Sequence, residues 1–319
     1  MKKLFFVIIA FLTITGFTKE EIASNIDKEI LNKFKNEMTQ VNIEQQSPWA
    51  IFQEIENNDY DAVKRLLDAG EKPNKRDWAN NTPLMWAAKR GHTKICELLI
   101  SYYPKNMFDK KLIDETNEFE WTALMFAAQN NHGETVKLLI EKGADKNHKT
   151  RNFSETVIGV AAQNGANKAI DALLKKGVDI EQKGGFGYTP LMTAIEANQV
   201  DTVLFLISDK VKVKANVNAQ DEMGETPLML AAALGHYKIL QILIANYARI
   251  NDKSYEDRTA LMYAAENGCY SCVEYMLSDE RLGKAKVNVR DIYGKTALYY
   301  AKLYGHTKTA EYLKSKGAI

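Results

Sequence analysis

The sequence lacks the charge imbalance that would favour a polyanionic partner. It has 42 Lys and Arg residues against 41 Asp and Glu residues. Proteins that bind nucleic acids or anionic membrane surfaces rely on an excess of basic side chains. The near-neutral balance therefore gives no electrostatic case for a nucleic acid or a membrane as the partner, and indicates a partner that is recognised by shape.

Motifs of the common catalytic and cofactor sites are also missing. The sequence contains no G-x-S-x-G, no P-loop and no H-E-x-x-H, and it has no second C-x-x-C to complete a zinc site. The glycine-rich run at 184–187 lacks the strand and the lysine that a phosphate-binding loop requires. These absences predict a protein that is not an enzyme and that holds no cofactor and no metal.

The apolar run at the N-terminus is too short to span a bilayer. The uncharged stretch Leu4–Thr18 has 15 residues, whereas a transmembrane helix needs about 20. Lys2 and Lys3 precede it and small residues follow, as in a secretory signal. We therefore expect residues 1–18 to be a signal peptide and the protein to be exported, either periplasmic or secreted. Because no A-x-A tripeptide marks a cleavage site, anchoring in the membrane by an uncleaved segment is the alternative.

A short motif does recur along the chain at nearly constant spacing. Six copies consist of Thr, then Pro or Ala, then Leu, then Met or Tyr, and they start at residues 82, 122, 189, 226, 259 and 296. A weaker copy starts at Thr156, and a first unit without the threonine starts at Trp49. Successive starts are separated by 33, 40, 34, 33, 37, 33 and 37 residues. Such a period indicates a repeat protein in which each unit is one supersecondary element.

The residue types inside a unit predict two helices. Threonine is a preferred N-cap, and proline is tolerated in the first turn because its missing N–H would be unpaired there anyway. Alanine pairs such as 87–88 follow, and small side chains let neighbouring first helices approach closely. The second segments carry apolar residues at i, i+3 and i+4, as at Val136, Leu139 and Ile140. This spacing predicts one buried stripe on each second helix.

A period near 33 residues with a Thr-Pro-Leu signature resembles the ankyrin repeat, a β-turn followed by two antiparallel helices. The resemblance covers about residues 49–319. It implies an all-α solenoid of eight helix-turn-helix units with β-turn fingertips. Before it, apolar residues recur every four positions over 20–42 and predict an amphipathic helix in an N-terminal segment, 19–48. That helix either covers the open first repeat or is a solvated linker.

Histidine and methionine recur in register with the repeat, and this pattern argues against metal sites. Adjacent helices pack about 8–10 Å apart, so copies in separate repeats cannot converge on one ion. The in-register histidines, ten residues after each threonine, are His92, His132, His236 and His306. The methionines, which stand where the family usually has histidine, are Met85, Met125, Met192, Met229 and Met262. Thioethers can bind Cu(I) outside the cytoplasm, but packing in the core is the favoured interpretation.

The cysteines Cys269 and Cys272 form a C-x-x-C at the start of a second helix, a position that stabilises a thiolate. In an exported protein the pair could form a disulfide, and two packed thiols are the other interpretation. The alternative to a binding protein is therefore an exported redox-active or metal-handling protein that uses this pair or the recurrent methionines.

The turns before the threonines supply the candidate binding residues, because aromatic side chains dominate binding hot spots. The candidates are Trp78, Phe119, Trp121, Phe153, Phe186, Tyr188, Met223, Tyr255 and Tyr293. The resemblance implies a monomeric, non-catalytic scaffold that binds a protein through its fingertips and the groove of its first helices. The competing interpretation is that these aromatics only stack between neighbouring turns. The identity of the partner cannot be predicted from the repeats, since a fold does not specify its ligand.

Overall fold

The computed structural model describes residues 49–103, 109–278 and 284–319. The chain divides into two units, Met1–Ala50 and Ile51–Ile319, and the second is described here. The expected signal peptide and the expected helix over 20–42 lie outside the described residues. Both therefore remain predictions.

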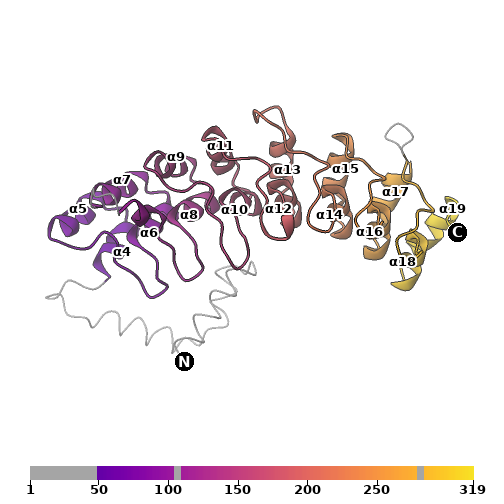
Figure 1. The fold of residues 1–319 in the computed structure, drawn as a ribbon, viewed down its shortest axis with the longest axis horizontal. Coiled ribbons are helices and arrows are strands. Elements are labelled where there is room, and N and C mark those ends of the chain that lie inside the picture. The colour runs from indigo at the N-terminus through magenta and orange to yellow at the C-terminus, as the bar shows by residue number, and fades with distance from the viewer. Residues whose placement is uncertain (1–48, 104–108, 279–283) are drawn as a thin grey trace, which may run out of the picture. The chain divides into compact units, whose positions relative to one another are not determined.

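The described residues contain sixteen α-helices in eight consecutive pairs, joined by turns and loops, and no strand occurs among them (Figure 1). The first helices of the pairs are α4 (Ala50–Glu56), α6 (Pro83–Arg90), α8 (Ala123–Gln129), α10 (Val157–Gln163), α12 (Pro190–Glu196), α14 (Pro227–Ala233), α16 (Ala260–Asn267) and α18 (Ala297–Leu303). The second helices are α5 (Tyr60–Asp68), α7 (Thr93–Ser101), α9 (Gly133–Glu141), α11 (Asn167–Lys175), α13 (Val200–Ile207), α15 (Tyr237–Ala245), α17 (Tyr270–Ser278) and α19 (Thr307–Ser315). Two short 3-10 segments, Asp109–Asp114 and Gly185–Gly187, complete the pattern. The prediction of an all-α repeat fold with eight helix pairs is confirmed.

The recurring threonine caps the first helix in six of its seven copies. In each of these six, the threonine hydroxyl accepts a hydrogen bond from the backbone N–H three residues later, as from Met85 to Thr82 at 3.2 Å. Such a cap stabilises a helix by about 1 kcal/mol. Thr259 is the exception, because its buried hydroxyl has no hydrogen-bond partner among the described residues.

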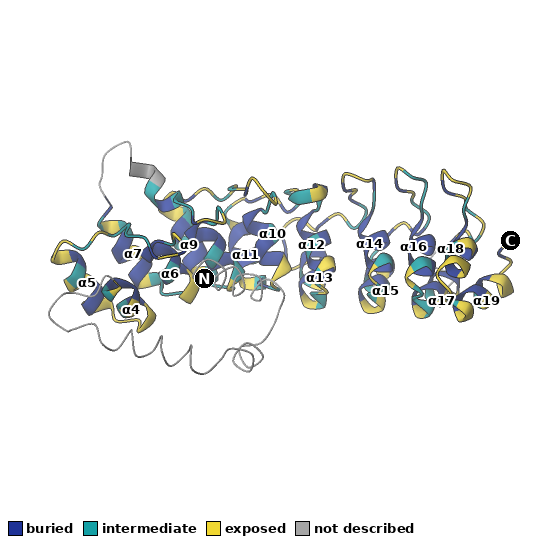
Figure 2. Cartoon of the chain, turned by 90° about the horizontal axis from the view of Figure 1, so that it is seen from below, coloured by how far each residue is buried: buried dark blue, intermediate teal, exposed yellow. Residues whose placement is uncertain are grey.

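Neighbouring repeats pack through like helices. The first helices from α6 to α18 contact one another in sequence, and most second helices contact the next second helix, as in α7 with α9 and α17 with α19. The alanine pairs make the close approach of first helices possible: Ala87, Ala88, Ala127 and Ala128 are fully buried. Figure 2 shows the buried residues as a continuous band along the repeats.

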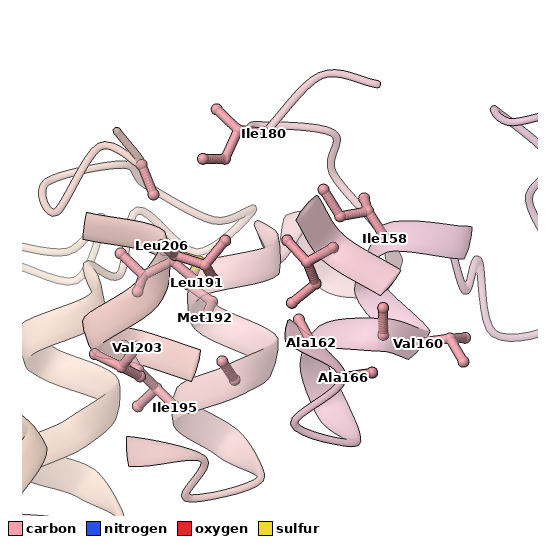
Figure 3. Packing of buried hydrophobic residues seen from close by; sticks show 14 of the residues in the cluster. Ile158, Val160, Ala162, Ala166, Ile180, Leu191, Met192, Ile195, Val203 and Leu206 are labelled. Carbon is pink, nitrogen blue, oxygen red and sulfur yellow. The ribbon is translucent and has the colours of Figure 1, made fainter. Parts of the chain in front are cut away.

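One hydrophobic cluster runs through all eight repeats, from Ile51 in α4 to Leu313 in α19. Figure 3 shows its packing in the fourth and fifth repeats, among them Ile158, Met192 and Leu206. All five in-register methionines are at most 1% exposed, so their predicted role in the core is confirmed. The sulfur of Met85 also accepts a hydrogen bond from the N–H of Thr82, 3.4 Å away.

The turn that follows the second helix requires a left-handed residue. Glycine adopts this conformation at no steric cost, as at Gly143 with φ 101°. In the sixth repeat Tyr247 stands in the same place with φ 68° and an 88% exposed side chain. A bulky residue in this region is strained, and Tyr247 therefore marks the sixth repeat as locally less favourable than its neighbours.

The last repeat is only partly polar where it meets solvent. Lys302 and Lys314 are exposed, as expected of a terminal repeat. Leu303 and Tyr304 beside them are more than half exposed as well. The polar surface that a terminal repeat needs is thus interrupted by apolar side chains.

Candidate functional site

The fingertips are the loops formed by the six residues before each recurring threonine, namely 76–81, 116–121, 150–155, 183–188, 220–225, 253–258 and 290–295. In five of them the second residue accepts hydrogen bonds from two backbone N–H groups of its own loop. Asp77 Oδ1, for example, accepts from Ala79 at 2.8 Å and from Asn81 at 2.7 Å. The corresponding acceptors in the other four loops are Asn117, Asp221, Ser254 and Asp291. These Asx- and Ser-type turns fix the loop backbone, so the tip side chains are held on a defined scaffold.

Backbone hydrogen bonds join the fingertips of the last four repeats to one another. The N–H of Glu222 donates to the carbonyl of Phe186 at 3.0 Å, and that of Tyr255 donates to Met223 at 3.0 Å. The N–H of Ile292 donates to Glu256 at 3.1 Å. Figure 2 shows these loops projecting on one side of α14, α16 and α18. The tips of the last four repeats therefore form a row whose spacing is set by main-chain contacts.

Seven of the nine predicted binding residues are exposed on the fingertips. They are Trp78, Phe119, Phe153, Phe186, Met223, Tyr255 and Tyr293. Phe153 and Phe186 expose 75% and 78% of their surface, which is far more than a residue stacked between neighbouring turns would expose. Exposed apolar groups gathered along one edge are typical of a binding surface.

The other two predicted residues, Trp121 and Tyr188, are half-buried. The indole N–H of Trp121 donates to the Glu155 carboxylate at 2.8 Å, and its ring lies 5.3 Å from that of Phe126. Burial, followed by nearby carboxylates, raises the pKa of Tyr188 to about 12. Both side chains pack against the hydrophobic core, so stacking between repeats accounts for much of their placement.

The groove formed by the first helices is also aromatic, but its side chains are engaged with one another. Arg258 lies over the rings of Tyr263 and Tyr300, 4.0 and 4.7 Å from their centroids, and pairs with Glu266. The hydroxyl of Tyr263 donates to Glu225, and that of Tyr300 donates to Asp291 at 2.5 Å. This network joins repeats six, seven and eight. It was not predicted from the sequence, although an arginine one residue before the threonine and a tyrosine four residues after it could have suggested the contact.

Two of the four in-register histidines make similar links between repeats, whereas Nε2 of His92 and of His236 is buried without a hydrogen-bond partner among the described residues. His132 Nε2 lies 3.1 Å from the carbonyl oxygen of Lys89, and His306 Nε2 lies 2.8 Å from that of Glu266. Within the described ranges, no group of three or more His, Cys, Asp and Glu residues is placed to hold a metal ion. The same part of the chain contains no helix with the length and apolar character to cross a membrane.

The sulfur atoms of Cys269 and Cys272 lie 2.00 Å apart in the structure, as in a disulfide. The N–H of Cys272, in the first turn of α17, donates to Cys269 Sγ at 3.3 Å. Cys272 is fully buried and Cys269 is partly exposed. The third cysteine, Cys96, is buried, and burial raises the pKa of its thiol far above the usual range. Cys96 is therefore unreactive. Oxidation of the Cys269–Cys272 pair in the cell remains a prediction.

Comparison with known proteins agrees with this architecture. A family model described as ankyrin repeats, in three copies, matches residues 51–150, 158–254 and 248–319. The chain belongs to the ankyrin-repeat family. Among solved structures, this ankyrin solenoid resembles the ankyrin repeat domain of Bcl-3 with a TM-score of 0.60 and 23% identity. That match covers 73% of this chain and 98% of the Bcl-3 domain, and it shows the shared fold.

The ankyrin repeats are also similar to those of much larger proteins. An ankyrin repeat and KH domain-containing protein, mask-1 from Caenorhabditis elegans, is 31% identical over 294 residues, covering 81% of this chain and 11% of mask-1. Inversin from Mus musculus is 29% identical over 133 residues, covering 42% of this chain and 12% of inversin. This ankyrin chain thus spans only about a tenth of the length of these relatives, and what their other regions do is not carried over.

Proposed function

We propose that this ankyrin-repeat protein is a non-catalytic scaffold that binds a protein partner through its fingertips and the groove of its first helices. The observation that carries the proposal is the set of seven exposed tip residues, five of which lie on loops fixed by their own side chains. A preorganised apolar edge binds a partner without the entropic cost of first ordering its loops. The groove contributes a more polar wall beside it.

Export is part of the same proposal. The support comes from Lys2 and Lys3 ahead of the uncharged Leu4–Thr18, the pattern of a secretory signal. The mature scaffold would then act as a monomer in the periplasm or outside the cell. N-terminal sequencing of the purified protein tests this part. A start between about residues 16 and 24 supports export, and an intact Met1 on soluble cytoplasmic protein contradicts it.

The binding surface is tested with a variant that removes four exposed tips, F119A/F153A/F186A/Y255A. Buried aromatic anchors at an interface typically cost about 2 kcal/mol or more each when truncated, so a partner captured by the wild-type chain should be lost. The measurement is the amount of that same partner retained by immobilised wild-type and variant chains.

Charge changes on the second helices provide the matched control. K137E and E274K alter a partly exposed side chain on α9 and an exposed one on α17, away from the tips, and should leave capture of the partner unchanged. If the tip variant captures the partner normally but unfolds early, the aromatics serve only packing between turns and the proposal is wrong.

A further inference from the structure

This inference rests on the proposed function and concerns the chemical class of the partner. The fingertips are acidic in a chain that is otherwise balanced: the seven loops contain ten Asp and Glu residues against seven Lys and Arg residues. Two loops, 116–121 and 220–225, carry five of the acidic residues and no basic residue. The excess is therefore local, and it lies next to the exposed apolar tips.

The basic side chains of the fingertips are already used within the protein. Arg76 donates to the carbonyls of Asn80 and Thr116 and pairs with Glu115 at 3.2 Å. Arg290 donates to the carbonyl of Gly294 at 2.9 Å, and Lys183 donates to that of Gln220 at 2.6 Å. These cations hold the loop backbones in place, so they are committed before a partner arrives.

The remaining cations are engaged with acidic or aromatic side chains. Lys253 pairs with Asp257 at 3.1 Å, and Arg151 pairs with Glu120 at 3.6 Å. Arg258 lies in the tyrosine network described above. The last cation, Lys295, lies 4.2 Å from the centre of the Tyr299 ring.

Three acidic tip residues have no such partner. Within the described parts of the chain, Glu118, Glu222 and Glu256 make no ion pair, and Glu118 and Glu222 are exposed. Each adjoins an exposed apolar tip residue in the sequence: Glu118 precedes Phe119, Glu222 precedes Met223 and Glu256 follows Tyr255. The unpaired charges on this edge are thus acidic and alternate with apolar contacts.

We propose that the fingertip edge selects a protein segment in which Lys or Arg side chains alternate with apolar ones. The apolar side chains would contact the aromatic tips, and the cations would pair with Glu118, Glu222 and Glu256. Exposed ion pairs of this kind contribute modestly to affinity and more to specificity and association rate, and salt weakens them. The aromatic tips supply most of the affinity, and the carboxylates supply the choice of partner.

The test compares two peptides of about twenty residues on the full chain, one alternating Lys with Leu and one alternating Glu with Leu, because an extended chain needs more than about ten residues to reach all three glutamates. The Lys-Leu peptide should bind more tightly, and its affinity should fall as salt rises. In the variant E118Q/E222Q/E256Q its dissociation constant should rise on the order of tenfold, which corresponds to three exposed pairs at about half a kcal/mol each. Fluorescence anisotropy of labelled peptides measures all three effects.

A matched control neutralises three exposed glutamates on the second helices, E97Q/E134Q/E274Q, and should leave binding unchanged. Equal binding of the two peptides, no binding of the Lys-Leu peptide, or an unaltered dissociation constant in E118Q/E222Q/E256Q overturns the inference. The variant F119A/F153A/F186A/Y255A separates failure of this inference from failure of the proposed function. If that variant binds neither peptide while E118Q/E222Q/E256Q binds as the wild type does, the tips bind a partner without selecting its charge.

Discussion

The fingertips and the groove of the first helices contain similar aromatic residues in different surroundings. Phe186 and Tyr255 on the tips expose most of their surface. Tyr263 and Tyr300 in the groove have an arginine over their rings and hydrogen bonds on their hydroxyls. Residue type alone therefore does not distinguish a binding side chain from one that joins repeats. What distinguishes them is whether the polar and ring contacts are already satisfied within the protein.

The largest effect is expected from removing the end of the repeat stack. Deleting 296–319 takes away α18 and α19 and uncovers Met276 and Leu277 of α17, which are 1% and 5% exposed in the intact chain. A newly exposed apolar face should drive aggregation. Size-exclusion chromatography checks this against the F119A/F153A/F186A/Y255A variant, which should stay monomeric. A truncated chain that remains monomeric with unchanged melting would show that the last repeat is not needed as a cover.

Two single substitutions compare how much the groove and the tips contribute to the free energy of unfolding. Arg258→Ala removes a guanidinium that is only 14% exposed and leaves Glu266 without its partner. Loss of this pair and of two cation–π contacts should lower the free energy of unfolding by about 2–3 kcal/mol. Phe186→Ala, on an exposed tip, should change it by no more than about 0.5 kcal/mol. Urea denaturation followed by circular dichroism measures both, and equal losses would mean that the tips are as structural as the groove.

Prediction from the sequence succeeds where the determining contacts are local. The threonine caps, the two helices of each unit and the buried methionines follow from residues a few positions apart. The groove network could not be predicted in the same way, because Glu225 and Tyr263 lie 38 residues apart and meet only when repeats stack. Trp121 shows the same limit, since its position in the turn indicates a tip while its contact with Glu155 of the next repeat makes it half-buried.

The predicted disulfide lies within one repeat, so its removal should lower the free energy of unfolding by less than the loss of Arg258. Reduction of Cys269 and Cys272 opens a loop with a sequence separation of 3. The chain-entropy model gives a loss of about 2 kcal/mol at most for such a short loop. Alkylation of the unfolded chain followed by mass spectrometry should label Cys96 alone without reductant and all three cysteines with it. Three labels without reductant would show that the pair consists of packed thiols.

The smallest expected change in stability comes from the carboxyl group of Glu196, at the end of the first helix α12. Partial desolvation at the end of α12 raises the pKa of Glu196 although much of its side chain is exposed, and no positive charge offsets this effect. A carboxyl whose pKa is higher in the folded than in the unfolded state stabilises the protein only while it is protonated. This contribution to stability is complete below the pKa of the unfolded state. It is lost as the pH rises through the pKa of the folded state. Glu196→Gln should therefore slightly raise the urea midpoint at pH 7 and leave it unchanged near pH 4. The exposed Glu222→Gln on a tip should change neither midpoint. If Glu196→Gln lowers the midpoint at pH 7, the carboxylate has a stabilising partner in the folded chain and the groove is more fully engaged than its contacts indicate.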